Sequence, residues 1–323
     1  MASNRRTVGR VAASLGMIGC AGWHAGPAGA ADPCRSASAR GLSVVQPHGD
    51  GARTITRCAR DGSLIQSQEL AVLQLDGRAV EKPMSVTRPT PTGGRVQVVY
   101  EYGTIADGGP AEAAQARAAA VDDSCTNGEF RFNGSPPRIP WAVRGYTYFA
   151  NVARMPHRDV DRQQITKGRH TWDKSYNGCG LNDVTLFSSR FGGATSATVH
   201  SYSDKRSVVD FGSLTPFTSD RSAIAISKLW WENGRMVEAD TRFEQPPAVP
   251  AGTFSWSVSG KREVHKWDLW SMAAHESGHA LGLGHATTSS QNFLTMSPVQ
   301  YQNSIRWQTL GRGDVLGLRA LYP

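Results

Sequence analysis

The pattern of apolar and polar positions divides the chain into a β-rich first part and a mixed second part. Over residues 31–124 the apolar runs are short, as in Leu70–Leu75 and Val96–Tyr100, and rich in β-forming residues. The loop-forming sequence Arg88–Gly94 separates these two runs. The alanine-rich segment Pro110–Val121 is compatible with a helix or a linker. We therefore expect a small β-rich region before the second part begins.

The second part, from about Cys125, mixes strand and helix patterns. A strand is expected at Gly145–Ala150, and a helix at Asp159–Trp172, where apolar residues recur at the spacing of one helical face. Asp268 is a suitable N-cap for a second helix, and a short helix is expected at Asp314–Leu321. Further strands are expected at Ala197–Tyr202, Ser207–Phe211, Ala223–Trp231 and Met236–Phe243. This mixture predicts an α+β fold with a twisted mixed sheet.

The N-terminus has the order of an export signal. Three arginines in the first ten residues precede an apolar stretch at 11–23, and Ala28–Ala30 provides a small-residue cleavage site. The apolar stretch is too short to span a bilayer, and no other segment has 18 consecutive apolar residues. Residues 1–30 are therefore expected to be a signal peptide and the protein to be secreted. Met17–Cys20 resembles a lipoprotein box, so a lipid anchor on Cys20 is an alternative.

Cysteine usage agrees with export. Of the five cysteines, Cys34, Cys58, Cys125 and Cys179 remain after either kind of processing. An even number of cysteines in an exported chain favours disulfides. Because the sequence contains no Cys-x-x-Cys pair, a thiolate metal site is not indicated. Among the three possible connectivities, Cys34–Cys58 with Cys125–Cys179 closes two local loops and is preferred.

The charge distribution argues against nucleic-acid binding. The formal net charge is +8, and the three N-terminal arginines account for part of it, so 8 − 3 leaves +5 on the processed chain. The remaining Lys and Arg are scattered rather than clustered in a stripe. We expect a monomer with a mildly basic surface.

The strongest chemical signal lies at residues 275–285, which read His-Glu-Ser-Gly-His-Ala-Leu-Gly-Leu-Gly-His. His275 and His279 are four positions apart and share one helical face. Three neutral imidazoles suit Zn²⁺ and leave a fourth position for water, as in catalytic sites. His285 lies about 15 Å further along a straight helix, so the chain must turn back to bring it to the metal. Gly282 is placed to make that turn.

Glu276 follows the first histidine directly. In that position it can serve as a general base without ligating the metal. With this chain's own residue frequencies, a chance match to the five fixed positions has odds on the order of 10⁻⁵ to 10⁻⁴. The motif therefore predicts a catalytic zinc site.

This string resembles the extended zinc signature of the metzincin metallopeptidases, His-Glu-x-x-His-x-x-Gly-x-x-His followed by a methionine turn. Met296 is the only methionine after His285 and is implied to form that turn. Three flanking segments resemble the matrixins in their shorter bacterial form: Met236–Phe243, Trp267–Leu269 and Leu310–Tyr322.

The resemblance covers residues 125–323 and implies a zincin-like metallopeptidase domain with a backing helix and an active-site helix. Residues 31–124 would then be a removable pro-segment or an accessory domain. An extended peptide or unfolded protein would pair with an edge strand at Ala223–Trp231. Its peptide bond would be hydrolysed by a zinc-activated water, with Glu276 as general base.

The chain departs from the family pattern in several places. Ser297 follows the turn methionine at a position where matrixins often have a tyrosine. The resemblance therefore does not assign the residue that forms the wall of the S1′ substrate pocket. His200 stands without the His/Asp cluster of a second, structural zinc. Calcium binding by Glu238 and Asp240 is an alternative to simple exposure of these acids.

Latency and function also leave alternatives. No Pro-Arg-Cys-Gly switch occurs, and the nearest inhibitory ligands are Cys34, Cys125 and Asp122-Asp123, although disulfides and a solvated linker compete for these residues. A zinc hydrolase of a non-peptide amide or ester would use the same residues. A catalytically silent zinc-binding module is the other alternative, but it predicts loss of the base or a ligand.

Overall fold

The computed structural model describes residues 43–47, 53–58, 64–73, 79–90, 94–104, 124–133, 140–182, 187–200, 202–217, 223–245, 255–286 and 294–323. The expected signal peptide, Cys20, Cys34, Asp122-Asp123 and the alanine-rich segment 110–121 lie outside the described residues. Among the described helices, none is long and apolar enough to cross a membrane.

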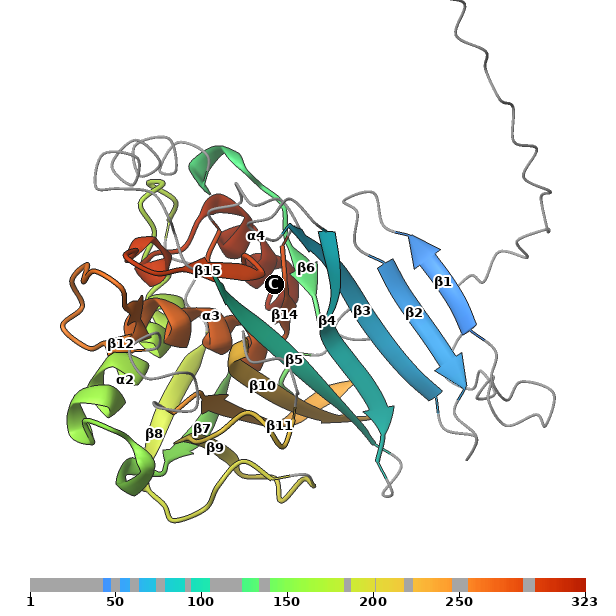
Figure 1. The fold of residues 1–323 in the computed structure, drawn as a ribbon, viewed down its shortest axis with the longest axis horizontal. Helices are drawn as coiled ribbons and strands as arrows, with labels where there is room; N and C mark the ends of the chain where they lie inside the picture. The colour runs from blue at the N-terminus through green and yellow to red at the C-terminus, as the bar shows by residue number, and fades with distance from the viewer. Residues whose placement is uncertain are drawn as a thin grey trace, which may run out of the picture.

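One mixed sheet runs through the described part of the chain (Figure 1). Its main strands are β1 (Ser43–Pro47), β2 (Arg53–Cys58), β3 (Leu64–Leu73), β4 (Ala79–Pro89), β5 (Arg95–Thr104), β7 (Gly145–Ala150), β8 (Ser188–Ala194), β9 (Ser207–Phe211), β10 (Ala223–Glu232) and β11 (Arg235–Phe243). Neighbouring strands follow the order β1-β2-β3-β4-β5-β10-β11-β9-β7-β8. With its helices, the sheet confirms the predicted α+β class.

The strands nearest the helices form the parallel part of the sheet. β8, β7, β9 and β11 pair in parallel, and β10 runs antiparallel to β11. Every residue of β9 is buried, as expected for a central parallel strand covered on both faces. β7 alternates half-buried and buried positions, so it contributes Tyr146, Tyr148 and Ala150 to the core.

Two helices pack against this part of the sheet. α2 (Asp159–Asp173) connects β7 to β8 and lies against α3 (Leu269–Leu281). Gly168 permits the close approach, because a Cβ built there would lie 2.5 Å from the backbone nitrogen of Ala274. The Trp172 indole nitrogen of α2 donates a hydrogen bond of 2.6 Å to the Ala274 carbonyl of α3. α2 is therefore the predicted backing helix, and it fixes the position of α3.

The remaining described elements are short. They are η2 (Val152–Arg154), β6 (Arg131–Phe132), β12 (Trp256–Ser257), β13 (Trp267–Asp268), β14 (Leu283–Gly284), β15 (Val299–Tyr301), η3 (Arg306–Gln308) and α4 (Arg312–Leu321). α4 includes the short C-terminal helix expected from the sequence.

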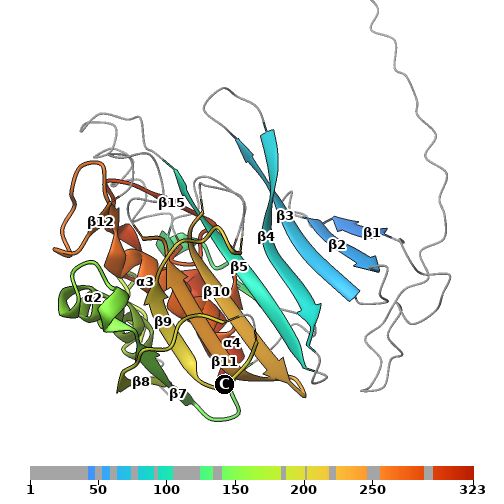
Figure 2. The same cartoon turned by 60° about the horizontal axis from the view of Figure 1, so that its bottom comes forward.

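The N-terminal strands do not form a separate sheet. β5 pairs antiparallel with β10, so β1–β5 extend the sheet of the second part, as Figure 2 shows. The expectation that Ala223–Trp231 is an open edge is therefore wrong in this structure. β10 has β11 on one side and β5 on the other.

The expected strand at Ala197–Tyr202 is also wrong. The backbone there bonds to side chains instead of a neighbouring strand: Asn151 donates to the Ala197 carbonyl, and Val199 donates to the Asp210 carboxylate. The outer strand of the sheet is instead β8, whose sequence Ser-Ser-Arg-Phe-Gly-Gly-Ala has few strand-forming residues.

Cys125 and Cys179 form a disulfide, with their Cα atoms 5.1 Å apart. This confirms one half of the preferred pairing. Cys34, in the other half, lies outside the described residues. Because its sulfur is bonded to Cys179, Cys125 is not a free thiol that could act as an inhibitory metal ligand.

The contact between α2 and α3 is testable at Gly168. Gly168→Ala places a methyl group against the α3 backbone and should lower the free energy of unfolding by about 1–3 kcal/mol. Gly178→Ala is the matched control, because a Cβ there meets nothing within 4 Å. Urea unfolding of both variants measures the difference. A Gly168→Ala variant as stable as the control would contradict this packing.

Candidate metal centre and active site

Helix α3 begins and ends at residues suited to those positions. The Asp268 carboxylate accepts hydrogen bonds from the Ser271 backbone nitrogen and hydroxyl, so the predicted N-cap is confirmed. Gly282 ends the helix with φ 110°, a left-handed conformation that costs a glycine little. The predicted turn out of the helix therefore occurs at Gly282.

The last carbonyls of α3 are satisfied by side chains from three distant segments. Asn133 donates to the His279 carbonyl, the Trp141 indole to the Ala280 carbonyl, and the Tyr322 hydroxyl to the Leu281 carbonyl. The distances are 3.0, 2.7 and 2.7 Å. The last carbonyls of a helix lack regular partners in the next turn, and these side chains, together with the Gly282 nitrogen at the His279 carbonyl, bind them where α3 stops.

The chain after Gly282 is held by the segment that follows Cys125. β14 pairs antiparallel with β6, and the Asn133 backbone nitrogen donates to the Gly282 carbonyl at 2.8 Å. Beyond His285, the Ala286 nitrogen donates to the Met296 carbonyl. The turn and both of its flanks are thus fixed by backbone hydrogen bonds.

The three predicted ligands come together at this turn. One ring nitrogen from each of His275, His279 and His285 lies within 4.8 Å of the others, and all three residues are buried. The Nε2 atoms of His275 and His279 are 3.0 Å apart. The Nδ1 atoms of the same two residues lie 2.5 and 2.8 Å from the carbonyl oxygens of Thr295 and Leu283.

This arrangement fits a zinc ion. With Zn–N bonds of 2.0–2.1 Å, tetrahedral ligand nitrogens lie about 3.3 Å apart. An imidazole whose Nδ1–H donates to a backbone carbonyl presents an unprotonated Nε2 to a metal. The carbonyls of Thr295 and Leu283 therefore select the tautomer of His275 and His279 that zinc requires.

Glu276 lies on the same helix and contacts the sheet. The Ser227 hydroxyl of β10 donates a hydrogen bond of 2.5 Å to Oε2 of Glu276. Both residues are buried, and the Ser227 oxygen also lies 3.4 Å from the Thr241 hydroxyl of β11. The contact orients the carboxylate and links the candidate base to the strand.

A buried cation lies behind the site. Arg169 of α2 is 3% exposed, and its guanidinium carbon lies 4.0 Å from the ring centroid of Tyr148. Burial lowers the pKa of Arg169 to about 9, while the carboxylates of Asp173 and Glu276 favour its charged form. Arg169 therefore provides positive potential on the buried side of the candidate base.

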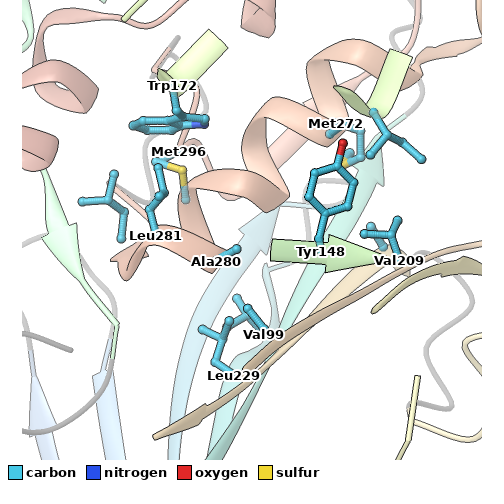
Figure 3. Close-up of a cluster of buried hydrophobic side chains, with 14 of the residues drawn as sticks. Val99, Tyr148, Trp172, Val209, Leu229, Met272, Ala280, Leu281 and Met296 are labelled. Atoms are coloured by element: carbon cyan, nitrogen blue, oxygen red, sulfur yellow. The ribbon is translucent and has the colours of Figure 1, made fainter. Parts of the chain in front are cut away.

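Met296 lies in a closely packed turn against α3. A Cβ added to Gly278 of α3 would lie 2.2 Å from the Met296 sulfur and 2.6 Å from Trp172. Figure 3 shows Met296 and Trp172 within the buried core. The Asp314 carboxylate of α4 holds this turn, accepting from the backbone nitrogens of Thr295 and Met296 at 2.8 and 3.1 Å.

Several residues that contact the site were not predicted from the sequence, among them Asn133, Ser227, Gln300 and Asp314. Gln300 of β15 has its Nε2 atom 3.3 Å from His275 Nδ1. Each of them is distant in sequence from the residue it contacts, so the motif contained no signal for it. Asp314 alone lay within a flanking segment that resembled the family.

Two acids considered for calcium lie beside a lysine. Glu238 accepts hydrogen bonds from the Ser203 hydroxyl and the Lys205 nitrogen, and Asp240 accepts one from the Val208 nitrogen. Burial raises the pKa of both carboxyls. Burial also lowers the pKa of Lys228 to about 8, an effect that these two carboxylates oppose. His200 accepts from the Lys228 ammonium through its backbone carbonyl.

Comparison with known proteins agrees with this geometry. The family model described as Matrixin matches residues 188–323, which include β8, the three histidines and the end of the chain. Human matrix metalloproteinase-20 is 32% identical over 113 residues, covering 35% of this chain and 20% of that protein. The chain thus matches about a fifth of the length of this relative. Residues 188–323 are thus similar to the matrixins, in agreement with the resemblance of the zinc signature.

The support from Asp314 can be tested through metal affinity. Asp314→Asn replaces one acceptor oxygen by an NH₂ group that faces backbone donors, which should cost about 1–3 kcal/mol of stability. Because Thr295 carries the carbonyl that orients His275, zinc affinity should fall by about 10–100-fold. Chelator competition measures the affinity. Asp159→Asn, whose side chain is 73% exposed, is the control and should match wild type.

Proposed function

We propose that the protein is an exported zinc-dependent endopeptidase in which His275, His279 and His285 hold the metal and Glu276 is the general base. The observation that carries the proposal is the convergence of three buried imidazoles next to an oriented carboxylate. Structural zinc sites normally fill all four positions with protein ligands, whereas a three-histidine set leaves one position for water. The donor set therefore favours a catalytic role.

The chemistry follows from the positions of these residues. Zn²⁺, when bound, supplies a Lewis acid for the scissile carbonyl and lowers the pKa of water toward neutrality. Glu276 takes the proton of the attacking water and delivers it to the leaving amine. Ser227 keeps the carboxylate oriented, and the buried Arg169 guanidinium interacts favourably with its negative charge.

A peptide substrate is supported by the similarity of residues 188–323 to the matrixins. The signal-like residues 1–30 support secretion, with a lipid anchor on Cys20 as the alternative. Calcium is not part of the proposal, because the Lys228 ammonium already lies near the carboxylates of Glu238 and Asp240.

A pair of variants separates metal binding from catalysis. Glu276→Ala removes the base but no ligand, so it should retain about one zinc per chain and lose hydrolysis by at least about 10²-fold. His279→Ala should lose both zinc and activity, because two imidazoles hold the metal too weakly. Zinc content is measured by metal analysis, and hydrolysis with an unfolded protein and with matched ester and amide compounds.

The controls distinguish the alternatives. His157→Ala changes a histidine whose side chain is 53% exposed and which is not one of the three grouped ligands, so it should retain zinc and activity. Hydrolysis of the ester compounds without cleavage of any peptide would support the non-peptide hydrolase instead. A Glu276→Ala variant as active as wild type would rule out the general-base assignment, and an active zinc-free protein would contradict the proposed function.

A further inference from the structure

Strand β5 passes between the two strands that contact the candidate site. Along one edge it pairs antiparallel with β10. Along the other edge it pairs antiparallel with β4 through Arg95–Val99 and parallel with β15 through Tyr102–Thr104. Opposite β10, Val99 is aligned with Ser227; opposite β15, Gly103 is aligned with Gln300. The β5 segment from Val99 to Gly103 therefore connects the position paired with Ser227 to the position paired with Gln300.

Ser227 and Gln300, which pair with β5, both contact residues of the candidate site. Ser227 donates to the Glu276 carboxylate, and Gln300 lies 3.3 Å from the His275 ring. Directly opposed residues in an antiparallel pair have Cα atoms about 4.5–5.5 Å apart. The backbone of β5 is thus within one strand spacing of the residue that orients the candidate base.

The docking of β5 is closely packed. Val99 is 2% exposed and belongs to the buried cluster that also contains Leu229 of β10 and Ala280 of α3 (Figure 3). On the opposite face of β5, Val98 packs against a second cluster that contains Ala223 and Ile226. β5 is therefore anchored through both of its faces rather than through backbone pairing alone.

This placement has a consequence for peptide binding. A strand can pair through its backbone with only one neighbour on each side, and β10 has β11 and β5 as its neighbours. An extended peptide cannot add to β10 while β5 is docked. The same strand separates β10 from β15, so it occupies the space between these two strands, which we call the peptide-binding channel.

We propose that β5 is an intramolecular inhibitor, which blocks the peptide-binding channel by strand pairing and makes the full chain latent. The inference rests on the proposed function, and it favours a pro-segment over an accessory domain for residues 31–124. No inhibitory thiolate is involved at Cys125, whose sulfur is bonded to Cys179. Release of β5 from β10 opens the channel.

A charge placed on the buried face of β5 tests this directly in the full chain. Val99→Asp should release β5 and raise the rate of extended-peptide hydrolysis by at least about ten-fold, because the binding-competent fraction rises. Val96→Asp introduces the same charge on the opposite face of the strand, at a half-buried position, and should change the rate by less than about two-fold. If the aspartate disturbs folding, Val99→Thr, which keeps the side-chain shape, should activate in the same direction.

A binding measurement makes the test independent of catalysis. A fluorescent peptide with the sequence of residues 95–104, Arg-Val-Gln-Val-Val-Tyr-Glu-Tyr-Gly-Thr, is titrated against the zinc-loaded full chain. Val99→Asp and Val99→Thr should bind it at least about ten-fold more tightly than wild type or Val96→Asp. The same peptide carrying Val99→Asp should bind each of these proteins more weakly than the unsubstituted peptide binds the Val99 variants.

The outcomes separate this inference from the proposed function. Equal peptide affinity for wild type and both Val99 variants would overturn it, as would equal hydrolysis rates in an active protein. Peptide binding by the Val99 variants without hydrolysis by any zinc-loaded variant would contradict the proposed function and still support the occupied channel.

Discussion

The site depends on one constraint, which is that the chain must leave α3 directly after the second histidine and return within a few residues. A continuous helix would carry His285 about 15 Å past His275. The left-handed turn at Gly282 makes the reversal possible, and three side-chain donors satisfy the carbonyls that the helix end leaves open. One of these donors, Asn133, lies eight residues after Cys125, whose disulfide to Cys179 ties this segment to the rest of the chain.

The same constraint explains why residues from both ends of the domain meet at the centre. Asn133 directly follows β6, and Tyr322 is the penultimate residue of the sequence. Asp314 of the closing helix holds the methionine turn, which in turn bonds to the segment after His285. The geometry of the zinc motif therefore depends on buried contacts from residues that are distant in the sequence.

The sequence was informative where local rules decide the structure. Helical spacing predicted α2, the cap at Asp268 was confirmed, and the glycine at 282 occurs at the expected turn. Strand patterns predicted β7, β9 and β11 closely because these segments contain β-branched and aromatic residues such as Tyr148, Val208 and Phe243. The Cys125–Cys179 pairing followed from a preference for local loops.

Long-range pairing was beyond this reasoning. β8 was missed because its glycine-rich sequence forms a strand only through its pairing with β7. The strand expected at 197–202 failed because side chains of Asn151 and Asp210 bond its backbone instead. The partner of β10 is β5, more than a hundred residues away, and no local pattern indicates that register. Ser227 and Gln300 likewise reach the site only through tertiary structure.

The central claim is that three imidazoles hold a zinc ion and leave one position open for chemistry. Zinc K-edge X-ray absorption of the metal-loaded full chain measures the ligand set directly. The account predicts three nitrogen ligands at about 2.0–2.1 Å, with the remaining coordination from oxygen. A sulfur ligand at about 2.3 Å, or fewer than three imidazoles, would contradict it.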